Sequence, residues 1–248
     1  MCRLLAKYGF FESWQEIVME FQKLAKFGKN APHQDGWGMA RSNEGNYAMS
    51  LIDKQLGSAY DSKHYYETIY SLKRQPQIVL CHLRKASPSV PITLANAQPF
   101  VTEKWGFMHN GTIYEAESLS RSKSYIQTSD NSDTEYFFHY LLTKISNGNP
   151  NESKLGTIAD SILSMENDFT SINCMLSNGE ELYVVRWCRR LYNYYTLFFY
   201  EENGSIIISS EPLLLERLMS QWEEIPNQSV LKISGIPAKT EIITYSEL

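Results

Sequence analysis

Cys2 is the residue whose type and position suggest chemistry most directly, because the chain begins Met1-Cys2-Arg3. Its small side chain is of the kind that allows an aminopeptidase to remove the initiator methionine. Removal leaves a thiol beside its own α-amine, which is a sulfur nucleophile with a base in the same residue. An α-amine titrates at about 7.7–8.0, so it can exchange a proton near neutral pH. Position alone also fits an early residue buried in a strand, so the other motifs must decide.

A second group that suits a site ends the apolar segment 77–83. This segment predicts a buried strand, and the period of two places His82 and Arg84 on the same face. Arg84 suits a buried ion pair, and His82 is interpreted as a core histidine rather than a catalytic one.

Two further motifs combine glycine with polar side chains. Gly36 and Gly38 flank Trp37 ahead of a predicted strand, where glycine permits a close backbone or ligand approach. A strand over residues 105–108 is predicted to stop at the sequence His-Asn-Gly-Thr of residues 109–112. Asn-Gly is a turn signal, so an ordinary hairpin turn is the alternative interpretation there.

Asp133 is part of the sequence Ser-Asp-Thr-Glu at residues 132–135. Ser132 and Glu135 have the spacing of a capping box, which predicts a helix over residues 136–145. A carboxylate in the first turn is favoured by the helix dipole. This structural reading accounts for Asp133 without any role in binding.

These motifs together resemble the class II glutamine amidotransferase domains in their order and spacing. The resemblance rests on Cys2, the loop His-x-x-Gly-Trp-Gly at 33–38, His-Leu-Arg at 82–84, His-Asn-Gly-Thr at 109–112 and Ser-Asp-Thr-Glu at 132–135. It covers the whole chain and is closest to stand-alone members without an attached synthetase. It implies an N-terminal-nucleophile hydrolase, an α+β protein with a four-layer αββα sandwich, in one domain over residues 1–248.

The resemblance also implies residue roles. Cys2 is the nucleophile and its amine the base, while the Asn110 side chain and the Gly111 N–H form the oxyanion hole. Arg84 binds the substrate α-carboxylate and Asp133 the α-ammonium. The walls of the pocket are formed by Trp37 and Gly38.

The reaction expected from these roles is hydrolysis of a γ-glutamyl amide through a cysteinyl thioester. The substrate is glutamine, with ammonia passed to a separate synthetase or other subunit, or a γ-glutamyl peptide or conjugate that is simply hydrolysed. The competing hypothesis is a non-catalytic module that binds a γ-glutamyl ligand and regulates a partner protein. A substitution departs from the stand-alone members, because Gln98 stands where they carry histidine in Asn-x-His-Pro-Phe.

Composition excludes other classes of protein. The 248 residues are 43% hydrophobic and 21% charged, enough for a sizeable core. A net charge of −5 and a pI near 5.6 argue against binding to nucleic acid. The sequence has no apolar run of about 18 residues and no signal segment, so we expect a cytoplasmic protein without membrane contact.

No metal or cofactor is expected. The four cysteines form no Cys-x-x-Cys pair, which excludes a zinc knuckle and a thioredoxin-type motif. His33, His82 and His109 with Asp35 invite a zinc reading, but their spacings suit no compact site.

The remaining pattern predicts the elements that position these residues. Strands are expected at 3–9, 37–41, 46–53, 77–83 and 105–108, and helices at 14–25, 61–73, 136–145 and 155–166. The last hundred residues predict strands at 169–176, 180–188, 194–200, 205–209, 229–234 and 240–244, interrupted by a helix at 211–219.

Overall fold

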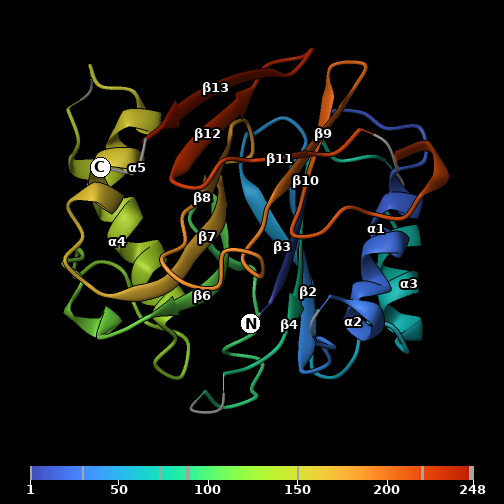
Figure 1. Cartoon of the computed structure of the whole chain (residues 1–248), viewed down its shortest axis with the longest axis horizontal. Helices are drawn as coiled ribbons and strands as arrows, with labels where there is room; N and C mark the ends of the chain where they lie inside the picture. The colour runs from blue at the N-terminus through green and yellow to red at the C-terminus, as the bar shows by residue number, and fades with distance from the viewer. Residues whose placement is uncertain are drawn as a thin grey trace.

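In a computed structural model the chain folds into two stacked sheets with helices on both outer faces, as Figure 1 shows. The structure describes residues 2–29, 31–72, 74–87, 90–149, 151–218 and 221–245. Met1, and with it the predicted removal of the initiator methionine, lies outside the described residues. Every pair of neighbouring strands in the two sheets is antiparallel.

Sheet A has seven strands in the described part of the chain, in the order β11-β9-β10-β1-β4-β2-β3. Sheet B has six, in the order β13-β12-β8-β7-β6-β5. The strands of sheet A are β1 (Arg3–Tyr8), β2 (Gly36–Ser42), β3 (Met49–Gln55), β4 (Ile78–Arg84), β9 (Phe198–Glu202), β10 (Ser205–Ser209) and β11 (Glu223–Glu224). Those of sheet B are β5 (Phe100–Thr102), β6 (Trp105–Ile113), β7 (Phe169–Ser177), β8 (Leu182–Arg186), β12 (Ser229–Ser234) and β13 (Lys239–Thr244).

The helices form the two outer layers. Sheet A is covered by α1 (Trp14–Gln22), α2 (Leu24–Phe27) and α3 (Lys63–Tyr70), and sheet B by α4 (Asp133–Asn147) and α5 (Lys154–Leu163). One apolar core lies under each helical layer, and a third lies between the sheets. The predicted α+β class and αββα layering are therefore confirmed.

The central strands of sheet A are buried on both faces, and alternation decides which side chains face sheet B. In β4, Leu80 belongs to the core between the sheets, whereas Cys81 and Leu83 belong to the core under the helices. His82 and Arg84 therefore face sheet B, on one face as their spacing predicts. In β1, Leu4 faces sheet B in the same way.

Two predicted elements are wrong. The strand expected to stop at His109 continues as β6 to Ile113, because Gly111 lets β7 pass very close: a Cβ on Gly111 would lie 1.8 Å from the Ser171 carbonyl oxygen. The helix expected at 211–219 is only a 3₁₀ turn, η2 (Glu216–Leu218), in its described part. The segment begins instead with Glu211, whose carboxylate accepts a hydrogen bond from the Lys29 N–H at 2.9 Å.

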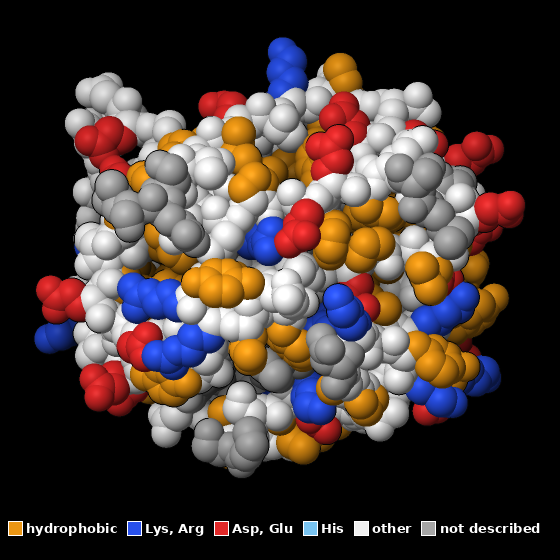
Figure 2. All heavy atoms as spheres, viewed as in Figure 1, with side chains coloured by type: hydrophobic (Ala, Val, Ile, Leu, Met, Phe, Trp, Pro, Cys, Tyr) orange, Lys and Arg blue, Asp and Glu red, His pale blue; other side chains and the backbone are white. Residues whose placement is uncertain are grey.

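The surface mixes charges of both signs. On the face shown in Figure 2, Lys and Arg side chains lie among Asp and Glu, with apolar side chains between them. Within the described residues, no helix has the length and apolarity needed to cross a membrane.

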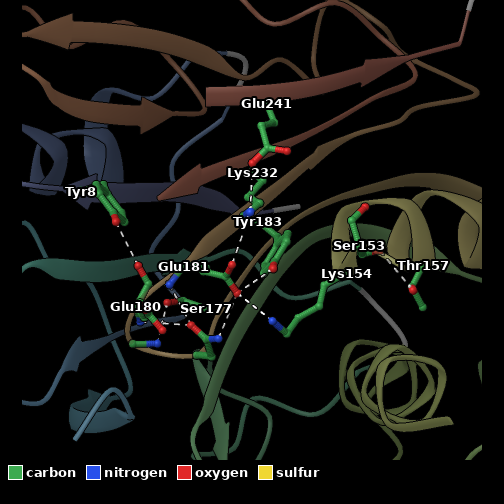
Figure 3. Close-up of polar contacts among 12 residues, drawn as sticks. Tyr8, Ser153, Lys154, Thr157, Ser177, Glu180, Glu181, Tyr183, Lys232 and Glu241 are labelled. Atoms are coloured by element: carbon green, nitrogen blue, oxygen red, sulfur yellow. Dashed lines mark hydrogen bonds and ion pairs between the residues drawn. The ribbon is translucent and has the colours of Figure 1, made fainter. Parts of the chain in front are cut away.

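A polar cluster lies near the end of β1 that is remote from Cys2 (Figure 3). Glu181 accepts hydrogen bonds from the Tyr183 hydroxyl at 2.8 Å and the Lys154 ammonium at 3.0 Å. Lys232 lies 3.5 Å from Glu181 and 2.9 Å from Glu241. We call these five residues the Glu181 cluster, and they tie β8, α5, β12 and β13 together.

Candidate active site

The structure brings Cys2 and Asn110 together from opposite sheets. Cys2 directly precedes β1 of sheet A, and Asn110 belongs to β6 of sheet B. The backbone nitrogen of Cys2 donates a hydrogen bond to Asn110 Oδ1 at 2.8 Å, across 108 residues of sequence. The Cys2 thiol lies 3.7 Å from the carbonyl oxygen of Lys85, just after β4. Both the thiol and the nitrogen of Cys2 are thus held by atoms from other elements.

The Asn110 amide also has a free donor. Its Nδ2 is buried and has no hydrogen-bond partner among the described residues. A buried amide N–H without a partner costs roughly 1–3 kcal/mol, a cost that a bound oxygen would remove. Gly111 follows in β6, where its lack of a side chain is required by the approach of Ser171. The site therefore offers an unused donor beside the Cys2 main chain.

Arg84 is the last residue of β4, and the two terminal nitrogens of its guanidinium differ in their hydrogen bonding. Its Nη2 donates to the Pro91 carbonyl at 2.7 Å, whereas its Nη1 is buried without a partner in the described structure. Burial lowers the pKa of Arg84, and Coulombic interactions with Cys2 and Asp35 act in the opposite direction. A buried guanidinium remains charged and favours an anionic partner, so this group suits a carboxylate.

Asp133 is the first residue of α4, and both of its carboxylate oxygens accept hydrogen bonds from backbone N–H groups. One carboxylate oxygen accepts from the Thr134 N–H at 2.8 Å, and the other accepts from the Ile113 N–H, at the end of β6, at 2.9 Å. The first oxygen, Oδ1, also accepts from the Thr134 hydroxyl at 3.4 Å. The second, Oδ2, retains a lone pair for a cation. The capping box predicted for Ser132 and Glu135 does not form, because the Glu135 carboxylate turns to the loop before the helix and accepts from Thr128 and Ser129.

Gln98 links β6 to α4. Its Oε1 accepts from the His109 backbone N–H at 2.6 Å, and its Nε2 donates to Thr134 Oγ1 at 3.2 Å. The Gln98 amide thus gives both the His109 N–H and the Thr134 hydroxyl a hydrogen-bond partner. Stand-alone relatives were expected to carry histidine at this position. A Cβ on Gly38 would lie 2.2 Å from the Gln98 carbonyl oxygen, so glycine is needed for β2 to meet this loop.

Trp37 is placed differently from the prediction. Its neighbour in register is Leu83 of β4, and both belong to the core under the helices. The indole packs edge-on against Tyr65 of α3, with 5.0 Å between ring centroids. The side chain therefore points away from the face that carries Arg84, which corrects the expectation that it walls the pocket. Gly38 is the next residue of β2, so it lies on the opposite face of the sheet, toward sheet B.

The buried histidines are neutral. Burial, followed by the charge of Arg3, lowers the pKa of His33 to about 3. Burial also lowers the pKa of His82 well below its usual value, and both of its ring nitrogens lack partners among the described residues. His109 Nε2 lies 3.0 Å from the Ser171 carbonyl oxygen. In the described residues, no three His, Cys, Asp or Glu side chains gather into a group that could hold a metal ion.

Sequence reasoning missed residues that act through hydrogen bonds between distant segments. Thr134 contacts both Gln98 and His109, the latter at 3.2 Å through Nδ1. Its only signal was its place inside the Ser-Asp-Thr-Glu motif. Arg3, Ser210 and Glu211 carried no signal, because nothing local shows that residues 210–211 pack against the start of the chain.

Comparison with known families identifies the class of protein. The family model of class II glutamine amidotransferases matches residues 1–197. The chain therefore belongs to the class II glutamine amidotransferase family, whose members hydrolyse the amide of glutamine. No curated protein sequence matches it.

Solved structures with little sequence similarity share the fold. The glutamine phosphoribosylpyrophosphate amidotransferase of B. subtilis, in complex with ADP and GMP, matches 97% of this chain at 18% identity with a TM-score of 0.67. A glutamine aminotransferase class-II domain protein of Silicibacter pomeroyi matches 98% of it at 17% identity with a TM-score of 0.63, over 100% of its own length. An allosteric regulatory enzyme of purine biosynthesis matches 97% at 17% identity with a TM-score of 0.70. The chain spans 49% of the B. subtilis enzyme and 48% of the third protein.

Proposed function

We propose that this protein hydrolyses γ-glutamyl amides, with Cys2 as nucleophile after removal of Met1. The observation that carries the proposal is the placement of Asn110. One end of its amide accepts a hydrogen bond from the Cys2 nitrogen, while the other end is a buried donor that no described residue contacts. A single side chain thus orients the base and supplies a donor for the oxygen that becomes negative.

The reaction follows from these positions. The Cys2 α-amine takes the thiol proton, and the thiolate attacks the amide carbon to give a tetrahedral oxyanion. Asn110 Nδ2 and the Gly111 N–H donate to that oxygen. Collapse breaks the C–N bond, and the amine leaves with the proton held by the α-ammonium. Water then hydrolyses the thioester and releases glutamate and the thiol.

The head group of the substrate fits the two charged groups at the site. Arg84 Nη1, which has no partner among the described residues, binds the α-carboxylate, and the remaining lone pair of Asp133 Oδ2 accepts from the α-ammonium. An amino-acid head group held at both charges leaves the γ-amide as the part that extends to Cys2. This selects γ-glutamyl compounds over simple amides.

Two kinds of substrate are compatible with this head group. One is glutamine, with ammonia used by a separate synthetase or other subunit in the cytoplasm. The other is a γ-glutamyl peptide or conjugate hydrolysed without a partner. Full activity of the isolated chain on γ-glutamyl peptides, with weak activity on glutamine, supports the second.

The test combines intact mass, N-terminal sequence and a glutamine-like diazoketone. We expect loss of Met1, a single adduct on Cys2, and protection by glutamine or glutamate. The Cys2→Ala variant should take up no adduct, while the buried thiols of Cys81 and Cys174 serve as internal controls. Processed protein that neither reacts nor releases ammonia or amine from any γ-glutamyl substrate would overturn the proposal and indicate a binding module.

A further inference from the structure

Arg3 binds the main chain of the residue that precedes it. Its side chain is 2% exposed and its Nη1 donates to the Cys2 carbonyl oxygen at 3.0 Å. Its Nη2 donates to the Lys29 carbonyl at 2.7 Å, and its Nε donates to the Glu211 carboxylate. The Tyr194 ring lies 4.7 Å from the guanidinium carbon. One guanidinium therefore joins Cys2 to three other segments of the chain.

The segment that follows β10 completes this arrangement. Glu211 accepts hydrogen bonds from the Arg3 side chain and from the Lys29 N–H. It therefore holds both partners of the contact between Arg3 and Lys29. Ser210 exchanges hydrogen bonds with Leu4: its hydroxyl accepts from the Leu4 N–H and its N–H donates to the Leu4 carbonyl, each at 2.9 Å. Both residues lie beyond residue 197, where the family match ends.

We propose that Arg3, held by Glu211, is a positioning residue for the Cys2 nucleophile. The inference rests on the proposed function, because it requires Cys2 to react. Once Met1 is removed, Cys2 is a terminal residue with no chain before it. Its orientation then depends on three contacts: Asn110 at its nitrogen, Lys85 at its sulfur and Arg3 at its carbonyl.

The contact with Arg3 is the directional one of the three. The planar guanidinium is fixed at all three of its nitrogens, so the carbonyl it binds cannot rotate freely. Rotation of the Cys2 carbonyl would swing the α-amine away from Asn110, since both are on the same residue. Glu211 neutralises the charge that this anchor would otherwise place beside the α-amine.

The chain offers a matched control for the loss of a buried arginine. Arg186 of β8 is 5% exposed, donates to the Ile225 carbonyl and pairs with Glu224. Like Arg3, it is a buried arginine that binds a carboxylate and the backbone, although it contacts one backbone carbonyl where Arg3 contacts two. Neither Arg186 nor Glu224 has a hydrogen bond to Cys2 among the described residues.

The first experiment compares Arg3→Gln with Arg186→Gln in processed, full-length protein. We expect Arg3→Gln to lower kcat for glutamine hydrolysis by about 10- to 100-fold, as for a nucleophile displaced by about 1 Å. KM should change by less than about twofold, because the head-group contacts remain. The rate of diazoketone alkylation of Cys2 should fall with kcat. Arg186→Gln should lower Tm while leaving kcat unchanged.

Equal kcat values for Arg3→Gln and wild type, or an equal loss in Arg186→Gln, would overturn the inference. Intact mass must first show that Met1 is removed equally from each protein. If the wild-type protein neither turns over substrate nor is alkylated at Cys2, the proposed function itself is wrong. This outcome differs from the one that overturns the role of Arg3.

Glu211→Gln keeps the test available if Arg3→Gln does not fold. This change retains the size of the side chain and removes its charge. Because charge-assisted hydrogen bonds are roughly twice as strong as neutral ones, we expect a kcat loss of about fivefold. Glu224→Gln is its control and should retain the wild-type kcat. An unchanged kcat in Glu211→Gln would contradict the role of the pair.

Discussion

The two ends of β1 differ in how the polar groups around them are paired. At the end that begins with Cys2, the Asn110 amide, the Arg84 guanidinium and the His82 ring hold buried nitrogens that have no partner among the described residues. At the other end, the Tyr8 hydroxyl donates to the Glu180 carbonyl at 3.0 Å, near the Glu181 cluster of Figure 3. No side-chain atom of that cluster is among the buried unpartnered atoms of the described residues.

The difference separates a site from a structural contact. Each buried donor or acceptor without a partner costs roughly 1–3 kcal/mol, so a fold retains several of them together only where something else supplies the partner. The Glu181 cluster is also polar, but its side chains pair with one another. Single unpaired polar atoms, such as Arg186 Nε, also occur elsewhere in the described structure. The gathering of several of them near Cys2, rather than any one alone, therefore supports the proposed site.

The largest effect is expected from the nucleophile. Cys2→Ser should lower kcat by at least about 10³-fold, because a hydroxyl is far less readily ionised than a thiol. Its unfolding transition should be close to wild type, since the two side chains have similar size. Ammonia release from glutamine and thermal unfolding measure the two properties. Activity near the wild-type level would place the nucleophile elsewhere.

The unpartnered amide gives the next largest effect. Asn110→Asp keeps an acceptor for the Cys2 nitrogen but removes the Nδ2 donor. We expect kcat to fall by about 10²–10³-fold, the usual loss for one oxyanion donor. Asn110→Ala, which removes both contacts, should lose at least as much. Steady-state kinetics on glutamine would contradict the assignment if Asn110→Asp retained the wild-type kcat.

Arg84 should act mainly on substrate binding. Arg84→Ala is expected to raise KM for glutamine by about 10- to 100-fold, because a hydrogen bond to a charged group contributes about 1.5–3 kcal/mol. An analogue of glutamine without the α-carboxylate provides the control, since wild type and variant should then differ little. A KM for glutamine that does not change would show that Arg84 does not bind the carboxylate.

The smallest effect on activity is expected at the far end of β1. Glu181→Gln should leave kcat and KM unchanged and lower the free energy of unfolding at pH 7 by about 1–3 kcal/mol. The exposed neighbour Glu180 gives the control Glu180→Gln, which should affect neither property. Chemical denaturation and glutamine hydrolysis together measure the contrast between the two ends.

The same variant should show a defined pH dependence. Burial alone would raise the pKa of Glu181, but hydrogen bonds from Tyr183 and Lys154 outweigh it and hold the pKa below its ordinary 4.5. A carboxylate with a lowered pKa stabilises the fold fully above its ordinary pKa and loses this contribution as pH falls through the folded value. The stability difference between wild type and Glu181→Gln should therefore persist above pH 4.5 and shrink in more acidic solution.

Local patterns predicted most of the layers. The apolar run before His82 and Arg84 predicted a strand. Because side chains in a strand alternate with a period of two residues, it also predicted that His82 and Arg84 lie on the same face. The strand expected at 37–41 agrees with β2, which begins at Gly36, but the face on which Trp37 lies was not predicted correctly. Successive residues of a strand point to opposite faces of the sheet, and at position 37 this alternation places the indole under α3.

Contacts between distant segments were not predictable in the same way. Gln98 looked like a departure from the family pattern, yet its amide satisfies both His109 and Thr134. Glu211 lay in a segment expected to be helical, and its partners are at the other end of the chain. Such hydrogen bonds depend on which strands become neighbours in the sheets. The periodicity of apolar residues within one segment does not show this.

The pairing of the chain's two ends also has a consequence during synthesis. β1 pairs with β10, and Leu4 and Ser210 exchange hydrogen bonds across 206 residues. At a translation rate of about 5–20 residues per second, roughly 10–40 s separate these residues on the ribosome. Through that interval the first strand cannot be enclosed between its final neighbours. The proposed removal of Met1 would therefore have this interval in which to occur, before folding covers the start of β1.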